Sequence, residues 1–279
     1  MNKLHDLLGL RTSPRIFFGA ATIVILFVVG TLIFTDPIAR GTEAASTWLM
    51  DNMGWFYVLG VTGFLVFLIY IAMSRFGRIK LGPDDEPAEH SGRSWFAMLF
   101  AAGIGTILMF WGVAEPVSHF GDPPRQGVEP ESVQAAEEAV AFTFYHFTYH
   151  TWAIFALPAL AFSYFIYKRN LPPRVSSILQ PILGERIHGR IGQVVDVLAI
   201  VGTVFGLAVS VGLGTLQING GLNQLFDIPE SDLTLLIVIV VVTTIALISV
   251  ALGLEKGIKR LSNINIIAAI ALMLFAFVT

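Results

Sequence analysis

The stretch Phe100-Ala-Ala-Gly-Ile-Gly-Thr-Ile-Leu-Met-Phe-Trp-Gly-Val-Ala-Glu-Pro116 has the greatest influence on the predicted fold. It is apolar enough to lie in a bilayer, yet it carries Gly103, Gly105 and Gly112, each of which disfavours a helix interior by about 1 kcal/mol relative to Ala. One interpretation is close packing of two helices at small residues. The other is a discontinuous helix whose backbone faces a solute, because freed backbone groups are tolerated in a membrane only beside protein or a water-filled cavity.

The composition indicates a membrane protein. Of the 279 residues, 55% are apolar and 13% are charged, whereas soluble domains carry about 25% charged residues. A net charge of −3 provides no basic stripe for nucleic acid. The chain contains no cysteine, which excludes disulfides, thiol chemistry and cysteine metal sites. We therefore predict an all-α membrane protein with a polytopic helical bundle.

Apolar segments of about 20 residues are long enough to cross the hydrocarbon core of a bilayer. The predicted crossings are Ile16–Phe34, Trp55–Met73, Trp95–Val113, Ala139–Tyr167, Val194–Ile218, Leu233–Leu252 and a shorter one from Ile264 to Thr279. Because the last segment is short for a crossing, we expect the chain to stop inside a helix and to be part of a longer protein.

Basic residues predict the orientation, because Lys and Arg are enriched in cytoplasmic loops. All but two of the 17 basic residues fall in the N-terminus and in alternate loops, and the exceptions are Arg40 and Arg125. We therefore expect a multi-pass protein of the cell (plasma or inner) membrane with a cytoplasmic N-terminus. Between the crossings, we predict a helix start at Ser132 and a short amphipathic surface helix over Leu254–Ser262.

Two histidines of the fourth crossing suggest a possible metal site. His146 and His150 are four residues apart and so would share one face of a helix, a spacing that can bind a metal. Glu115 is placed at the outer end of the third crossing, and no further cluster completes the ligand shell. A membrane-embedded metalloenzyme using His146 and His150 is therefore the alternative function, and packing or hydrogen bonding is the preferred role for the pair. A retinal photoreceptor is excluded, because no Lys occurs in any crossing to form the Schiff base.

Aromatic residues of the same crossing predict a ligand. Phe147, Trp152 and Phe155 lie within nine positions, and desolvated aromatic faces attract quaternary ammonium groups by about 2 kcal/mol each. A packed core or an aromatic belt is the competing interpretation. In the fifth crossing, the hydroxyls of Thr203 and Ser210 are candidate oxygen ligands for sodium.

Together these segments resemble the betaine/carnitine/choline transporter family over nearly the whole chain. The matching motifs are Ala101-Ala-Gly-Ile-Gly105, Met109-Phe-Trp-Gly-Val-Ala-Glu-Pro116, His146…His150-x-Trp152, and Gly202-Thr-x-Phe-Gly206 leading to Leu216-Gln217. The run Pro181-Ile-Leu-Gly-Glu-Arg-Ile-His-Gly-Arg-Ile-Gly192 is most similar to the choline-transporting branch.

The resemblance implies a LeuT-like fold of twelve helices, with two leading helices before two inverted five-helix repeats. Residues 1–94 would then hold the N-terminus and the leading pair, and residues 95–279 the first repeat, truncated in family helix seven. It also implies a secondary transporter that moves choline, glycine betaine or carnitine by alternating access, in symport and for osmoprotection. No cofactor is expected, homotrimers occur in the family, and the 279-residue chain by itself is not expected to transport.

The resemblance places the solute against Trp152, Phe147 and Phe155, with Gly103 and Gly105 allowing close backbone approach. Trp152 keeps the family's usual residue, while Phe replaces the common Trp at position 147 and the common Tyr at 155. Phe retains a π face but lacks the indole area and the phenol hydroxyl. At position 107, Ile replaces the third glycine of the family motif, where proton-coupled choline members carry Asp.

The resemblance also bears on ion coupling. Thr203 matches the first of two sodium-binding threonines of sodium-coupled members, while Leu207 replaces the second. A second sodium ion would use backbone carbonyls near Ala101 and Ile104. The resemblance therefore leaves sodium (Na+), proton and exchange coupling open, with one of the two sodium sites altered in this sequence.

Overall fold

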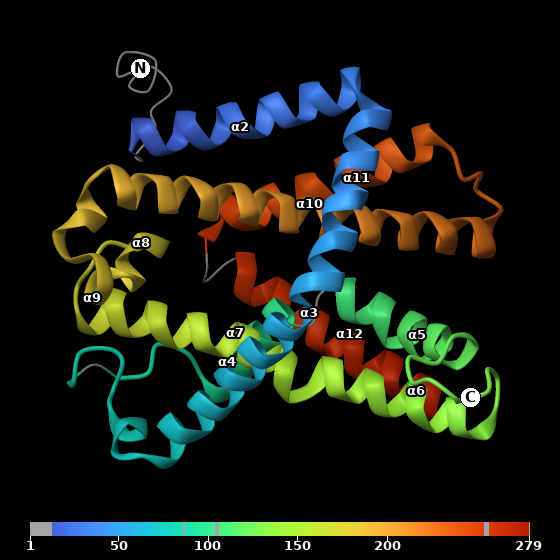
Figure 1. The fold of residues 1–279 in the computed structure, drawn as a ribbon, viewed down its shortest axis with the longest axis horizontal. Helices are drawn as coiled ribbons and strands as arrows, with labels where there is room; N and C mark the ends of the chain where they lie inside the picture. The colour runs from blue at the N-terminus through green and yellow to red at the C-terminus, as the bar shows by residue number, and fades with distance from the viewer. Residues whose placement is uncertain (1–12, 86, 104–105, 254–256, 279) are drawn as a thin grey trace. The chain divides into compact units, whose positions relative to one another are not determined.

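The computed structural model describes residues 13–85, 87–103, 106–253 and 257–278 of the chain. Every regular element in these ranges is helical (Figure 1). The elements are α2 (Pro14–Ile33), α3 (Thr35–Met73), η1 (Arg75–Arg78), α4 (Gly92–Gly103), α5 (Thr106–Gly121), α6 (Val133–Tyr145), η2 (His146–His150), α7 (Thr151–Phe162), η3 (Ser163–Lys168), α8 (Val175–Ile178), α9 (Gln180–Leu183), η4 (Gly184–His188), α10 (Arg190–Phe226), α11 (Asp232–Ala251) and α12 (Lys259–Val278).

Six described helical stretches are long and apolar enough to cross a membrane, which confirms the predicted polytopic α-helical class. They are Pro14–Ile33, Thr35–Met73, Val133–Lys168, Arg190–Phe226, Asp232–Ala251 and Lys259–Val278. The predicted third crossing corresponds to two shorter helices, α4 and α5, with 12 and 16 residues. Residues 104–105 between them lie outside the described residues, so the interruption expected at Gly103 and Gly105 stays a prediction.

Two predicted boundaries were wrong. The second helix begins at Thr35 and not at Trp55, and residues 35–54 contain three Ala, one Leu and two Met, which favour helix. Pro37 lies in its first turn, where a missing backbone N–H removes no intrahelical bond. A short surface helix over Leu254–Ser262 was also expected. Residues 254–256 lie outside the described residues, and α12 runs from Lys259 through Ser262 to Val278, because the apolar residues that follow Ser262 extend the same helix.

The chain divides into two compact units, one formed by Met1–Glu86 with Tyr149–Gly206, the other by Pro87–Thr148 with Leu207–Thr279. The two units are defined by which residues lie close together in space. The division into segments 1–94 and 95–279 rests on the family repeat and stays a prediction. Each unit is described by itself below.

In the first unit, α3 packs against α7 and α2, and the rings of Phe27 and Phe205 meet edge to face with centroids 4.8 Å apart. The buried Asp196 carboxylate on α10 accepts hydrogen bonds from the backbone N–H (2.9 Å) and the hydroxyl (3.0 Å) of Ser176. Asp196 thereby satisfies an N-terminal donor of the one-turn helix α8, which no intrahelical carbonyl can reach.

In the second unit, α5 lies along α6, and α4 packs against α12 (Figure 1). The small side chains of Ala135 and Ala139 are buried on α6, which permits close approach of a neighbouring helix. The predicted helix start at Ser132 is confirmed, because its hydroxyl oxygen accepts a hydrogen bond from the Ala135 N–H at 3.0 Å. This cap fixes where α6 begins.

Candidate functional site

The candidate site lies around η2, where the helix formed by α6 and α7 is irregular. η2 is a five-residue π-helical turn, and Thr148 within it has φ −101° and ψ −118°, which is not helical. The Thr148 hydroxyl donates a 2.5 Å hydrogen bond to the Phe144 carbonyl, the group that the Thr148 N–H would use in a regular helix. A side chain that competes for this acceptor weakens the helical ladder locally.

The irregular turn lies between the two histidines that the sequence placed on one face. His146 contacts Glu115 of α5, whereas His150 lies 3.3 Å from the hydroxyl of Thr62 on α3. Each histidine has a hydrogen-bonding partner on another helix, and four-residue spacing defines a shared face only where the helix is regular. The preferred role for these residues, hydrogen bonding, is confirmed for both.

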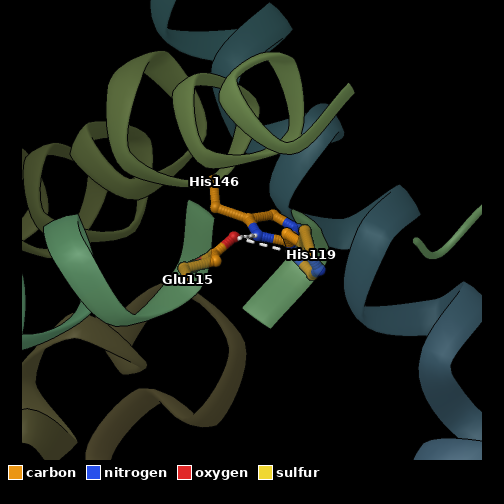
Figure 2. Close-up of side chains that lie close together, drawn as sticks. All are labelled: Glu115, His119 and His146. Atoms are coloured by element: carbon orange, nitrogen blue, oxygen red, sulfur yellow. Dashed lines mark hydrogen bonds and ion pairs between the residues drawn. The ribbon is translucent and has the colours of Figure 1, made fainter. Parts of the chain in front are cut away.

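Glu115, His119 and His146 form a polar cluster, called here the Glu115 cluster (Figure 2). One oxygen of Glu115 lies 3.3 Å from Nε2 of His119, one turn further along α5, and also contacts Nδ1 of His146. Glu115 is only 8% exposed, although the sequence placed it at the outer end of a crossing. The two imidazoles supply the polar partners that a buried carboxylate needs.

Sequence reasoning missed the Glu115 cluster. One signal was available, because Glu115 and His119 are four residues apart and so share a face of a regular helix. His146 is 31 residues further along the chain, and only the packing of α5 on α6 brings it to the same place. α5 also continues past Pro116 to Gly121, beyond the predicted end at Val113.

The predicted aromatic residues are divided between the two units. On α7, the rings of Trp152 and Phe155 lie with centroids 6.3 Å apart and planes tilted by 56°; both side chains are partly accessible, with 38% and 46% exposure. Phe147 belongs to the other unit. It lines a cavity of about 400 Å³ between α5 and α6 with seven other residues, which are Leu108, Gly112, Pro116, Val140, Thr143, Phe144 and Thr148.

The remaining predicted site residues lie on several helices or outside the described residues. Gly105 and Ile104 lie outside the described residues. Gly103 is the last residue of α4, and Ile107 belongs to the first turn of α5. Ala101 on α4 and Thr203 on α10 belong to different units, so their joint role in binding sodium stays a prediction.

The hydroxyl of Thr203 donates a 2.8 Å hydrogen bond to the Ala199 carbonyl in its own helix. It borders a cavity of about 510 Å³ that Asp196 also lines. The lone pairs of the hydroxyl oxygen remain available to a hard cation, because the oxygen acts as donor in this hydrogen bond.

These helices define a polytopic helical membrane protein. The sequence model described as "BCCT, betaine/carnitine/choline family transporter" matches residues 15–279, and the chain belongs to this family, as its motifs predicted. Since the family consists of transporters, the predicted absence of enzymatic function is confirmed, and the alternative of a metalloenzyme using His146 and His150 was wrong.

Three relatives illustrate the similarity. The chain is 50% identical over 271 residues to the ectoine/glycine betaine/proline transporter of Corynebacterium glutamicum, covering 97% of the chain and 44% of that relative. It is 42% identical over 265 residues to the high-affinity choline transport protein of Escherichia coli K12, with coverage of 95% and 39%. Against a glycine betaine transporter of Bacillus subtilis, identity is 43% over 269 residues, with coverage of 96% and 52%. The chain thus spans about half the length of these relatives or less.

Proposed function

We propose that this chain is part of a secondary transporter that moves quaternary ammonium osmolytes, such as choline or glycine betaine, across the cell membrane by alternating access. The observation that carries the proposal is the pair of rings on α7, Trp152 and Phe155, within a chain of the betaine/carnitine/choline family. Two neighbouring partly exposed π faces suit a trimethylammonium group, which carries positive charge but donates no hydrogen bond.

Phe147 adds a third ring to this proposal. The cavity that it borders between α5 and α6 is lined mainly by apolar side chains and by Gly112, where the missing side chain leaves room next to the backbone. We propose that the solute contacts Phe147, Trp152 and Phe155 during transport, with Gly103 and Gly105 close to it and Ile107 bordering the site.

The coupling, orientation and assembly belong to the same proposal. The basic residues support a cytoplasmic N-terminus in the plasma or inner membrane. We propose sodium symport through Thr203 and backbone carbonyls near Ala101 and Ile104, an osmoprotective role, and a homotrimer in which this chain supplies the two leading helices and the first five-helix repeat.

Uptake of radiolabelled choline and glycine betaine tests the proposal, in cells that lack other osmolyte transporters and express the full-length protein containing this chain. Loss of one desolvated cation–π contact of about 2 kcal/mol corresponds to a roughly 30-fold weaker apparent affinity, which is the expectation for Trp152→Ala. Trp152→Phe should retain most of the affinity because it keeps a π face.

The matched control is Trp48→Ala, because Trp48 is an exposed tryptophan on a different helix, α3. Unchanged affinity in Trp152→Ala would remove the proposed site. Absence of uptake of either solute by the wild-type protein at equal surface expression would remove the proposed function. Replacing sodium by choline-free potassium buffer separately tests the coupling ion.

A further inference from the structure

The Glu115 cluster combines three side chains that bind transition metals, and the family assignment does not explain it. The ligand atoms, one carboxylate oxygen and two imidazole nitrogens, all lie within 4.8 Å of one another. Two helical elements supply them: α5 provides Glu115 and His119, and the first residue of η2 provides His146.

The geometry is close to that of a bound ion. Zinc binds imidazole nitrogen and carboxylate oxygen at about 2.0–2.2 Å, so two ligands of one ion lie at most about 4 Å apart. The Glu115 oxygen and His119 Nε2 are 3.3 Å apart, which already satisfies this limit. The widest separation in the cluster needs to shrink by less than about 1 Å, which is within the reach of side-chain rotation.

The chemistry of the ligands selects the class of metal. Calcium and magnesium prefer shells composed of oxygen ligands, whereas this cluster offers one carboxylate and two imidazoles. Imidazole suits Zn²⁺, Ni²⁺ and Cu²⁺, and two histidines with one glutamate are a known zinc ligand set that leaves a fourth position for water.

Burial and access also favour an ion. Glu115 is largely excluded from solvent, and a buried carboxylate is stabilised by a cation. The His146 side chain is 47% exposed, which gives an ion a route to the cluster. The rings of Phe142 and Tyr145 lie beside His119 and His146, with centroids 5.7 and 5.6 Å away, and provide an apolar border.

We propose that Glu115, His119 and His146 bind one divalent transition-metal ion of the Zn²⁺ class, which ties α5 to the junction of α6 and η2. This inference does not depend on the transported solute and concerns binding, not catalysis.

Titration calorimetry with ZnCl₂ tests the site on the chain purified in detergent with a tag that lacks histidines. We expect one equivalent of Zn²⁺ per chain, a higher unfolding temperature when the metal is bound, and a visible d–d absorption spectrum when Co²⁺ is used instead. His119→Ala and His146→Ala should each weaken the affinity at least about tenfold, since loss of even an outer-shell partner costs 10–100-fold. Glu115→Gln, which keeps the shape of the side chain, should do the same.

His150→Ala is the matched control, because His150 lies in the same turn but contacts Thr62; His188→Ala is a second, exposed control. Both should bind Zn²⁺ as the wild type does. Absence of binding heat and of a cobalt spectrum in the wild-type chain would overturn the proposal, and this result does not depend on whether any variant folds. Equal affinities in wild type and in cluster variants that retain their helical circular dichroism would overturn it as well, and so would equal losses in His150→Ala and His146→Ala.

Discussion

His146 and His150 are the same residue type in the same five-residue turn, yet they have different surroundings. His146 contacts a buried carboxylate that a second histidine also approaches. His150 has a neutral hydroxyl partner, Thr62, in the other unit. The difference shows that the turn at Thr148 divides one apolar crossing into a segment that belongs with α5 and α6 and a segment that belongs with α3.

The largest expected effect on stability comes from removing the carboxylate of Glu115. Glu115→Ala leaves two imidazoles without their shared acceptor and should lower the free energy of unfolding by about 1–3 kcal/mol. Glu137→Ala, at an exposed position of α6, should change it by less than about 0.5 kcal/mol. Thermal unfolding in detergent, followed by circular dichroism, measures both. Equal effects of the two substitutions would show that the cluster does not stabilise this unit.

A smaller effect is expected on the other side of the turn. Thr62→Val removes the hydroxyl next to His150 while nearly preserving the shape of the side chain, and a neutral hydrogen bond contributes about 0.5–1.5 kcal/mol. The same unfolding measurement applies, with Thr42→Val as control, because the Thr42 hydroxyl bonds only within its own helix. A larger loss in Thr62→Val than in Glu115→Ala would reverse the proposed contrast between the two histidines.

The turn itself can be altered with a smaller change in stability. In Thr148→Val the hydroxyl no longer competes for the Phe144 carbonyl, so the backbone N–H of residue 148 can take this acceptor and make η2 more regular. We expect slower hydrogen exchange of the amides of residues 148–150 and a change in unfolding free energy below about 1 kcal/mol. Faster exchange in the variant would show that the hydroxyl supports the turn.

The smallest expected effect concerns an exposed ion pair. Lys168 at the end of η3 donates a 2.6 Å hydrogen bond to Asp84, and this bond and the positive charge lower the pKa of Asp84 from its usual 3.8. Because the folded-state pKa is lowered, the contribution to stability is present above pH 3.8 and is lost as pH falls through the lower folded value. It should be small, because the pair is exposed to solvent and screened by salt.

Asp84→Asn should therefore have a slightly lower unfolding temperature than the wild type above pH 3.8. The unfolding temperatures of the two proteins should converge at acid pH, because the wild type loses the stabilising ion pair there. Raising the salt concentration should reduce the difference between the two proteins above pH 3.8. If the unfolding temperatures of the two proteins differ by the same amount at all pH values, the ion pair is not the cause of the difference in stability.

Much of the fold could be predicted because membrane insertion depends on local properties of the chain. The length and hydropathy of the apolar segments predicted a crossing that overlaps each of the six described helical stretches long enough to cross, although Lys259–Val278 starts five residues before the predicted segment. The motifs of Ala101–Gly105, Met109–Pro116, His146–Trp152 and Gly202–Gly206 together predicted the family. The helical residues 35–54 were missed because this segment mixes polar and apolar residues and forms no continuous apolar run.

By itself, the sequence determined the helical membrane class, the family, the helix start at Ser132 and the ring pair on α7, because each depends on residues within a few turns of one another. Only the tertiary structure decided that His146 joins Glu115 and His119 while His150 turns to Thr62. The physical reason is that helix packing brings together residues 31 and 88 positions apart, and a single irregular turn changes which face each histidine occupies.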